Sequence, residues 1–511
     1  MHQREIFSIV GLPPEVLAVA MAKYSRSPES IKDTIDELTE EKSAEFHEKW
    51  VLGYGDASVA DMAVIPFALE NVSILASKVV EDNRIASYQE KSTRYVPFNV
   101  ERYHTPEEIS VNPEALSIYQ DGIQELMAGY AQTIETMIAH YRKLYPCPET
   151  LKEKMYANKL RARALDVARY LLPTATLTNF GMIMNARSLR HCISKLLAHP
   201  LKEMNAVGHE IEHAATHSAY NPNLKKIEST LASLLASTTQ PHVVGQLKVQ
   251  LNLQMKGAPT LVKHTEPKQY LIKKRETMRS WAKSLQLAEG SLQHANECRV
   301  DYLSEPITPE EELVATLLYA ESICSFRTIL EVVRQLPENK KREIITSVQT
   351  ERGSHDWLSR EFEVGQGMMF DTFFDYGAFR DIQRHRICTQ INQELSIEHG
   401  YEVPRDLEEA GGLERFQSIF KSNHDRVMKL ESLIGQSAQY LMAMGWRKRT
   451  LFKMNLREFH HLIELRTKAG GHFSYRDLCY NMYEQVKAAH PLLVEHLRAV
   501  KPDFPKEFFE R

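Results

Sequence analysis

The feature of this chain that most constrains its fold is an internal repetition near the end of each half. Residues 168–171 read Ala-Arg-Tyr-Leu and precede Asn-Ala-Arg-Ser-Leu at 185–189. Residues 438–441 read Ala-Gln-Tyr-Leu and precede Asn-Leu-Arg-Glu-Phe at 455–459, with the same internal spacing. Matches that recur at a fixed separation indicate one structural unit present twice. We therefore expect two domains with a common fold.

The predicted domain boundaries follow from this repetition. We place repeat one at residues 1–225, a lysine-rich connector at 226–296 and repeat two at 297–511. Near the start of repeat two, Thr308 is followed by Pro309 and a run of glutamates. A hydroxyl residue before proline and acidic residues is a strong signal for the first turn of a helix. We expect a helix to begin there.

The spacing of apolar residues predicts that most of the chain is helical. Apolar side chains recur every three or four residues at 113–145, 156–172, 185–218, 268–293, 414–443 and 455–498. Short strand-like or alternating runs predict strands at 6–10, 299–303 and 247–253. The expected fold class is α+β, rich in helix, with a small sheet in each repeat.

Composition narrows the class of protein without identifying it. The 511 residues are 43% hydrophobic and 25% charged with a net charge of −4, ordinary values for a globular protein that give no sign of a nucleic-acid partner. Six cysteines without a C-x-x-C spacing argue against a disulfide framework or a cysteine zinc site. No secretory apolar segment or membrane-length apolar run is present. We expect a cytoplasmic protein with no membrane partner.

Two incomplete copies of one polar motif carry the chemistry. Residues 384–386 read Arg-His-Arg, whereas Glu90, Ser92 and Arg94 lie in a polar run that ends at Tyr95. Guanidinium groups match phosphate geometry, and an imidazole stacks on or donates to a flat heterocycle, so the first run would suit a pyrophosphate-bearing cofactor. A hydroxyl and a guanidinium two residues apart can reach one phosphate. The alternative is a solvated charged face and an ordinary turn, but the repetition favours a site.

Together these runs resemble the signature R-H-R-x-x-S-x-N-E-x-S-x-R-Y of flavin-dependent thymidylate synthases, and residues 185–189 resemble that family's second fingerprint. The resemblance implies two tandem flavin-dependent thymidylate synthase-like domains. It also implies an enzyme that methylates dUMP reductively to dTMP. Methylenetetrahydrofolate would give the carbon, FAD the hydride, and NADPH would reduce the flavin.

The resemblance implies a role for each matching residue. Arg466, eleven residues after Asn455, is the expected catalytic arginine beside the uracil ring. The residues expected to bind dUMP are Glu90, Ser92, Thr93, Arg94 and Arg169. The residues expected to bind FAD are Ser58, Asn185, Arg187, Arg384, His385, Arg386, Asn455, Arg457 and His461. No metal ligand is expected, and a third family element, Gly-His with a hydroxyl and an acidic residue, is degraded at 55–61 and 353–356.

Each repeat has lost what the other retains. Repeat two keeps Arg-His-Arg and Arg466 but has Gln439 where repeat one has Arg169, and repeat one has Leu196 at the position of the catalytic arginine. Members of the family are homotetramers whose sites draw on neighbouring subunits. We therefore expect one working composite site built from both repeats, one degenerate class of site, and a homodimer that imitates a tetramer.

Two other hypotheses stay open at this point. The chain could act on another pyrimidine, or bind a nucleotide without turnover, because residues 389–394 have drifted from the signature. A zinc hydrolase is a remote alternative, since His209, Glu210 and His213 have the spacing of a zinc-peptidase helix, although the charged Glu212 departs from that motif.

Overall fold

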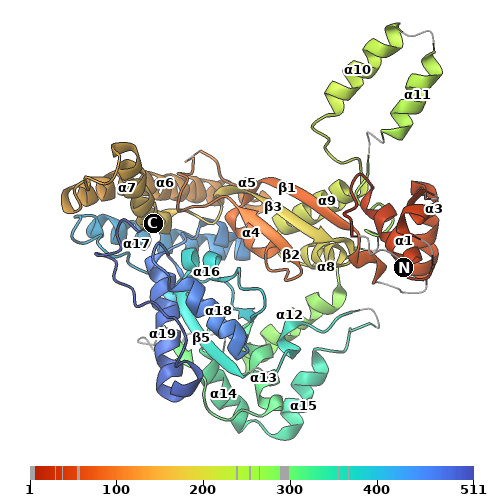
Figure 1. Cartoon of the computed structure of the whole chain (residues 1–511). Helices are drawn as coiled ribbons and strands as arrows, with labels where there is room; N and C mark the ends of the chain where they lie inside the picture. Colours follow the sequence, from red (N-terminus) through yellow and green to blue (C-terminus); the bar gives the residue numbers. More distant parts are fainter. Residues whose placement is uncertain are drawn as a thin grey trace.

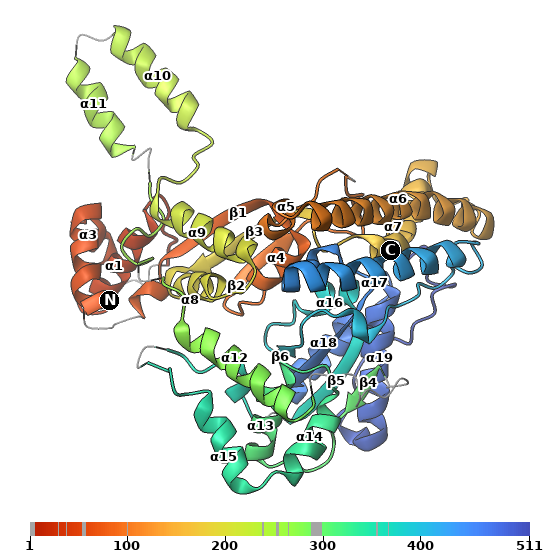
Figure 2. The ribbon, with the colours of Figure 1, turned by 180° about the vertical axis from the view of Figure 1, so that it is seen from behind.

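The fold is taken from a computed structural model of the chain. The structure describes residues 6–28, 30–36, 38–53, 58–99, 101–237, 240–251, 255–263, 265–287, 299–353, 356–365 and 367–510. The N-terminal half forms the upper layer of the molecule in Figure 1 and the C-terminal half lies below it. The view from behind in Figure 2 shows the same division, with a helical hairpin that stands away from both halves.

The first half of the chain consists of short N-terminal helices, a three-stranded sheet and two long helices. Its elements are α1 (Pro14–Tyr24), α2 (Ile31–Asp36), α3 (Glu40–Phe46), η1 (His47–Gly53), η2 (Val59–Asp61), β1 (Val64–Ser73), α4 (Ile74–Val80), β2 (Ala86–Glu90), α5 (Glu107–Ser110), α6 (Pro113–Leu144), α7 (Glu153–Ala168), η3 (Arg169–Leu171), β3 (Leu177–Asn185), α8 (Ala186–Leu197) and α9 (Lys202–Thr216).

The second half repeats the order of the central elements. It contains β4 (Val300–Tyr302), α13 (Pro309–Tyr319), α14 (Phe326–Gln335), α15 (Glu338–Ser347), η5 (Arg360–Phe362), β5 (Met368–Asp375), α16 (Tyr376–Ile382), β6 (Thr389–Asn392), η6 (Ile397–His399), α17 (Leu413–Ile434), η7 (Gly435–Leu441), β7 (Arg447–Met454), α18 (Leu456–Arg466), α19 (Phe473–Ala489) and η8 (Pro491–Leu493). Between the halves are α10 (Leu224–Ser237), α11 (Pro241–Gln250) and α12 (Gln269–Ser284).

The two sheets have equivalent antiparallel topologies. The strand order is β1-β3-β2 in one sheet and β4-β5-β7-β6 in the other, so β3 and β7 are the equivalent central strands. In the first half β1 runs directly into α4, and a turn leads on to β2, which pairs with the other edge of β3. In the second half β5 runs directly into α16, and a turn leads on to β6, which pairs with the other edge of β7. Both halves are therefore built on one unit, and the fold is α+β with helix predominant.

Side-chain caps explain why helices begin at matching places in the two units. Ser73 Oγ accepts a hydrogen bond from the backbone N–H of Ala76, and Asp375 Oδ1 accepts one from Ala378, at 2.9 and 2.7 Å. The asparagines of the second fingerprint do the same for α8 and α18. Asn185 accepts from the N–H of Ser188 at 2.8 Å, and Asn455 accepts from Glu458 at 3.0 Å. Such N-caps stabilise a helix by about 1 kcal/mol each.

The two halves meet through a nearly symmetric backbone contact. Thr174 N–H donates to Met442 C=O at 2.9 Å, and reciprocally Met444 N–H donates to Leu172 C=O at 2.8 Å. Ala175 donates to Tyr440 and Gly445 to Tyr170 in the same reciprocal way, at 3.0 and 2.8 Å. The same patch on both partners is the mark of an isologous, two-fold interface. The two repeats therefore pack on each other as a pseudodimer.

The long helices α6 and α17 extend this interface and lie side by side in both views (Figures 1 and 2). Gly122 and Gly129 of α6 let the helices approach closely, because an added Cβ would lie 2.8 Å from Leu441 and 2.6 Å from Ile419. The arrangement carries one large apolar core across both halves. A smaller second core lies between α12–α15 and one face of the second sheet.

Several predicted elements are confirmed and others are wrong. The strand at 299–303 and the helix start at Thr308 are confirmed, and Thr308 and Glu311 form a reciprocal capping box. Residues 6–10 are irregular, because no neighbouring strand pairs with them among the described residues. Residues 247–250 belong to α11 rather than to a strand, because Val243, Leu247 and Leu251 have the four-residue spacing of one helix face.

Several predicted long helices are interrupted. The segment at 185–218 is two helices, α8 and α9, and 455–498 contains α18 and α19. The segments at 156–172 and 414–443 end in 3₁₀ turns, η3 and η7, which contribute residues to the backbone contact between the halves. The helix expected at 268–293 ends at Ser284, and residues 288–293 lie outside the part of the chain that is described.

Candidate functional site

A large cavity, with a volume of about 1320 Å³, lies between the two halves. It is lined by the ends of α4 and α16, by one face each of α8 and α18, and by α12. Its walls carry Arg384, His385, Arg386, His461 and Arg466, which are five of the expected site residues. A cavity of this size, lined by cations and imidazoles, suits a large anionic ligand with a flat ring.

His385 and Arg466 form a hydrogen-bonded pair at the wall of this cavity. Arg466 Nε donates to His385 Nε2 at 2.8 Å, and the guanidinium lies 5.6 Å from the centre of the Tyr475 ring. His385 Nδ1 lies 3.1 Å from Glu458 Oε1. Burial lowers the pKa of His385 and outweighs the hydrogen bond with Glu458, which raises it. The ring is therefore neutral at physiological pH, and it holds the arginine at a fixed position.

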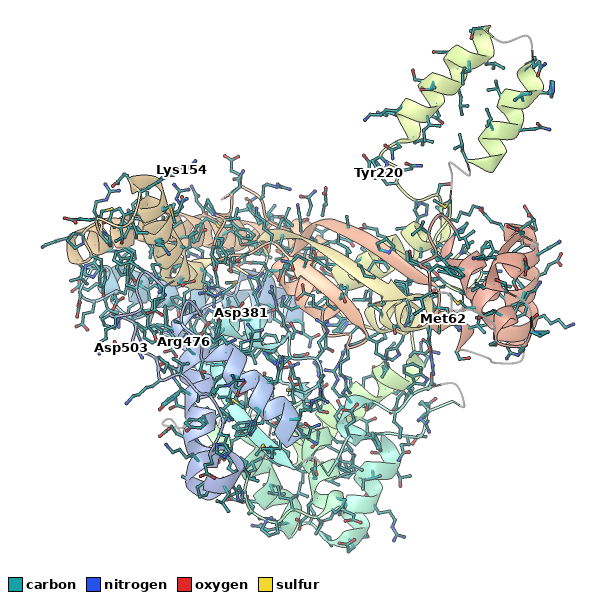
Figure 3. The ribbon with its side chains drawn as sticks, in the orientation of Figure 1. Met62, Lys154, Tyr220, Asp381, Arg476 and Asp503 are labelled. Atoms are coloured by element: carbon teal, nitrogen blue, oxygen red, sulfur yellow. The ribbon has the colours of Figure 1, made fainter. Side chains whose placement is uncertain are left out.

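Four guanidinium groups from both halves act electrostatically on one carboxylate, that of Asp381 on α16, which Figure 3 labels near the middle of the molecule. Arg169 Nη1 donates to Asp381 at 3.1 Å. Burial alone would raise the pKa of Asp381, but Arg169, Arg94, Arg466 and Arg384 together hold it well below its usual value. Expected substrate-binding and catalytic arginines thus converge, although they lie far apart in the sequence.

Arg169 is the most buried member of this cluster, with 1% of its surface exposed. Its Nε and Nη2 atoms have no hydrogen-bond partner among the described residues. Buried guanidinium N–H groups without a partner are costly. The cluster of four arginines, Asp381 and the nearby Asp166 therefore retains donors and positive charge that an anion could satisfy.

The expected phosphate loop lies beside the cavity rather than on its wall. Arg94 donates through Nε and Nη2 to Asp166, at 2.8 and 3.3 Å, and through Nη1 to Tyr475 Oη at 3.1 Å. Ser92 Oγ accepts from the N–H of Arg94 at 3.2 Å. Arg94 and Arg466 thus contact the same tyrosine. A phosphate contact by Arg94 would require it to exchange part of its bonding with Asp166.

Glu90 is buried in an ion-pair network that joins the two halves. Its carboxylate accepts from Lys78 Nζ at 2.8 Å and Ser77 Oγ at 2.9 Å in one half, and from Arg380 Nη2 at 2.6 Å in the other. Thr93 lies 3.5 Å from the same guanidinium, at the limit of a hydrogen bond. Arg384 Nη2 is 4.0 Å from Glu90. The Glu90 carboxylate is thus engaged by other side chains of the protein, and Glu90 is not among the residues that line the cavity.

The remaining expected FAD-binding residues are not among those that line the cavity. Asn185 and Asn455 act as helix caps, and Arg457 is exposed beside the second cap. Arg187 donates to Asp61 at 3.1 Å and lies 5.2 Å from the ring of Trp357, which lines the cavity. Ser58 is exposed next to η2.

Of the degraded third element, Gly55, Asp56, Ala57, Ser354 and His355 lie outside the described residues. The roles expected for all these residues in FAD binding stay predictions.

The equivalent of this site on the opposite side of the pseudo-two-fold axis carries opposite charges. Asp82 occupies the position of Arg384 and is paired with Arg360 at 2.8 Å and with Lys195. Glu394 occupies the position of Ser92 and accepts from Arg279 of α12 at 2.5 Å. Carboxylates at these two positions repel phosphate. The helix α12, for which the sequence suggested no role, closes this side of the cavity.

Two important residues were missed in the sequence. Asp381 lies in a polar run, and no local signal indicates that distant arginines converge on it. Glu458 carries a clearer signal, because it replaces the serine that the fingerprint has at Ser188. A buried carboxylate where the matching repeat has a small hydroxyl indicates a new partner, which proves to be His385.

The zinc alternative concerns exposed residues of α9. His213 stacks on His217 with ring centres 3.7 Å apart, and His209 lies 3.7 Å from Glu212. In the described part of the chain no group of three or more His, Cys, Asp or Glu side chains could hold a metal ion. None of the described helices is long and apolar enough to cross a membrane.

The fold and the cavity together define a class: two copies of one α+β unit that enclose a cationic site between them. The family described as "Thymidylate synthase complementing protein" matches the chain at residues 10–217 and again at 315–492. The chain therefore belongs to this family and carries two copies of its domain.

Relatives of two lengths resemble the chain. A UPF0159 protein from Chlamydia pneumoniae is 28% identical over an alignment of 519 positions that covers 96% of this chain and 90% of that protein. A flavin-dependent thymidylate synthase from Clostridium tetani is 29% identical over 176 residues, 34% of this chain and 67% of that protein.

A crystal structure of Thymidylate Synthase X from Helicobacter pylori with FAD and dUMP covers 40% of this chain and 89% of that one at 18% identity, with a TM-score of 0.23.

Proposed function

We propose that this protein is a flavin-dependent thymidylate synthase in which one chain supplies both halves of a single composite site. The observation that carries the proposal is a set of contacts between the halves: Arg94 and Arg466 contact the same Tyr475, and Arg169 donates to Asp381 at 3.1 Å. An array of fixed guanidinium groups suits a nucleotide monophosphate such as dUMP. The two family matches support the assignment of the reaction class.

The residues of the cavity fit FAD. Arg384, whose side chain is 42% exposed, and Arg386 offer cations for a pyrophosphate, and His461 lies beside them on the cavity wall. When bound, FAD would supply the hydride, after reduction by NADPH, and methylenetetrahydrofolate would supply the carbon. The ring of Trp357, which Arg187 contacts, lines the cavity and offers a flat surface. The protein's part is to orient and to polarise.

Arg466 is the proposed catalytic residue. Uracil C5 is a weak nucleophile, and negative charge develops on the ring as C5 attacks the carbon donor. A guanidinium held beside the ring stabilises that charge without reorganising, and donors of this kind contribute about 3–4 kcal/mol. The bond from Nε to His385 leaves the two terminal nitrogens of Arg466 without a hydrogen-bond partner among the described residues, so that they can donate to a ligand.

We further propose that the domains span residues 1–225 and 297–511, with the connector at 226–296. We also propose that two chains assemble into a pseudotetramer of four related units. The pseudodimer contact between the repeats supports this, because each chain already contains one such pair. The carboxylates Asp82 and Glu394 support the view that the second class of site does not take a phosphate.

Rescue of a thymidine-requiring bacterial strain tests the proposed reaction. The wild-type chain should restore growth, and Arg466→Ala should not, because a loss of about 3–4 kcal/mol lowers kcat by roughly 10²–10³-fold. Arg498→Ala, at an arginine that is 85% exposed on the surface, is the matched control and should rescue growth. Failure of a folded, expressed wild-type chain, or growth with Arg466→Ala, would contradict the proposal.

A second candidate is a homologue that binds a flavin and a nucleotide but acts on another pyrimidine or does not turn over. The bonding of Arg94 to Asp166 favours this reading, because a loop expected to hold the substrate phosphate already has a carboxylate partner. A purified protein that binds FAD and dUMP but forms no dTMP, with methylenetetrahydrofolate and NADPH supplied, would select this candidate over the first.

A further inference from the structure

We propose that Glu458 is a positioning residue that fixes the tautomer of His385 and thereby sets the orientation of Arg466 at the site. The inference deepens the proposed function and rests on it for the role of Arg466. Glu458, His385 and Arg466 form a continuous chain of two hydrogen bonds, 3.1 Å and 2.8 Å long, that ends at the cavity wall.

The hydrogen-bond donors of these three side chains allow only one arrangement of protons on the His385 ring. The guanidinium Nε of Arg466 carries a hydrogen and cannot accept, so His385 Nε2 must be the acceptor and must lack a proton. The remaining ring proton is then on Nδ1, where it is donated to Glu458 Oε1. The other tautomer, with its proton on Nε2, would point N–H at N–H and would expel Arg466 from this position.

Burial makes the arrangement selective. Glu458 and His385 are each about 4% exposed, so water does not compete for the ring nitrogens. Cys388 Sγ donates weakly to the same Glu458 oxygen, at 3.6 Å, and keeps it directed at the ring. A carboxylate that holds an imidazole in one tautomer is a known means of orienting the group on its other nitrogen.

The two repeats differ at this position in a way that supports the inference. Repeat one has Ser188 where repeat two has Glu458, and its positions for His385 and Arg466 are held by Asn83 and Leu196. A carboxylate thus occurs only in the repeat that also has a histidine and an arginine to orient. In repeat one, Ser188 lies at the equivalent wall of the same cavity.

The decisive measurement uses Glu458→Ser, which installs the residue of repeat one. In the wild-type full-length protein, ¹⁵N NMR of histidine-labelled samples should show His385 as the Nδ1–H tautomer. In Glu458→Ser we expect a shift toward the Nε2–H tautomer, a lower pKa for His385, and dUMP binding weakened by about 10- to 100-fold. The pKa falls because the hydrogen bond and charge of Glu458, which raise it, are gone.

Glu464→Ser is the matched control, because Glu464 is on the same helix but pairs with Arg498 at the surface. It should leave the tautomer, the pKa of His385 and dUMP affinity unchanged. A wild-type Nε2–H tautomer, or a Glu458→Ser variant with an unaltered His385 tautomer, would overturn the positioning role. If the tautomer changes as expected but neither the wild type nor Glu458→Ser binds dUMP or FAD, the positioning role of Glu458 is supported and the proposed function is contradicted.

Discussion

Asp381 shows at the scale of single residues how this site balances its charge. Its carboxylate neutralises part of a cluster of four guanidinium groups, and Arg169 donates to it directly. Removing one partner of a buried pair leaves the other charge uncompensated, which costs about 3–5 kcal/mol. An anionic ligand bound in the cluster would offset that cost.

We predict that Asp381→Asn lowers the free energy of unfolding by about 3–5 kcal/mol at neutral pH. Inorganic phosphate should stabilise this variant more than the wild-type protein, because the anion takes the place of the lost charge. Thermal unfolding with phosphate, against sodium chloride at equal ionic strength, measures both effects. An equal response of the two proteins to phosphate would show that the cluster is not an anion site.

Residues of this site differ in how far the sequence reveals them. The fingerprint spacing identified Asn455 and Arg466 together, because both lie on one helix whose period is fixed. The role of Glu90 in binding dUMP stays a prediction, and the structure adds that Glu90 is buried between Lys78 and Arg380. No sequence signal indicated this network, because Arg380 comes from α16 of the other repeat, and a motif within one repeat carries no information about that neighbour.

At the scale of elements, the contact between α4 and α16 depends on this Glu90 network. Burial would raise the pKa of Glu90, but Arg380 and Lys78 outweigh it and lower the pKa below its ordinary 4.5. A carboxyl with a depressed folded-state pKa stabilises the fold fully above its unfolded pKa. That stabilisation is lost as the pH falls from about 4.5 through the folded-state value.

We predict that Glu90→Gln lowers the free energy of unfolding by about 3–5 kcal/mol at neutral pH. The variant should also lose less stability than the wild type when the pH is lowered below about 4.5, because it has no carboxylate to protonate. Urea unfolding at neutral and acid pH checks both. Parallel pH profiles for the two proteins would mean that Glu90 does not carry the acid sensitivity; Glu464→Gln at the surface is the control.

Helices and strands were predicted well where the local sequence determines the conformation, and poorly where pairing with a distant strand determines it. The capping box at Thr308 is local and was predicted correctly. The alternating run at 247–253 fits either a strand or a helix face; residues 247–250 pair with no strand in the described structure and are helical in α11, and residues 252–253 lie outside it. Residues 6–10 likewise lack a pairing strand.

At the scale of the whole molecule, duplication places two copies of one unit in a single chain, with a cavity between them. The backbone contact around Pro173 and Ala443 fixes the two repeats in a reciprocal arrangement. One cavity then draws arginines from both repeats, and the opposite side carries Asp82 and Glu394 in place of Arg384 and Ser92. The internal repetition predicts two units of one fold, which the structure shows, whereas the single working site stays a prediction; nothing in the sequence indicated that α12 lines the second side of the cavity.

The number of FAD molecules bound by each chain tests the central claim most directly. Calorimetric titration of the purified protein should give one flavin per chain. Binding should be weakened by Arg386→Ala in the second half and also by Arg187→Ala in the first, because Arg386 lines the one cavity and Arg187 contacts Trp357, which lines it too. Two flavins per chain, or binding that depends on only one half, would contradict a composite site.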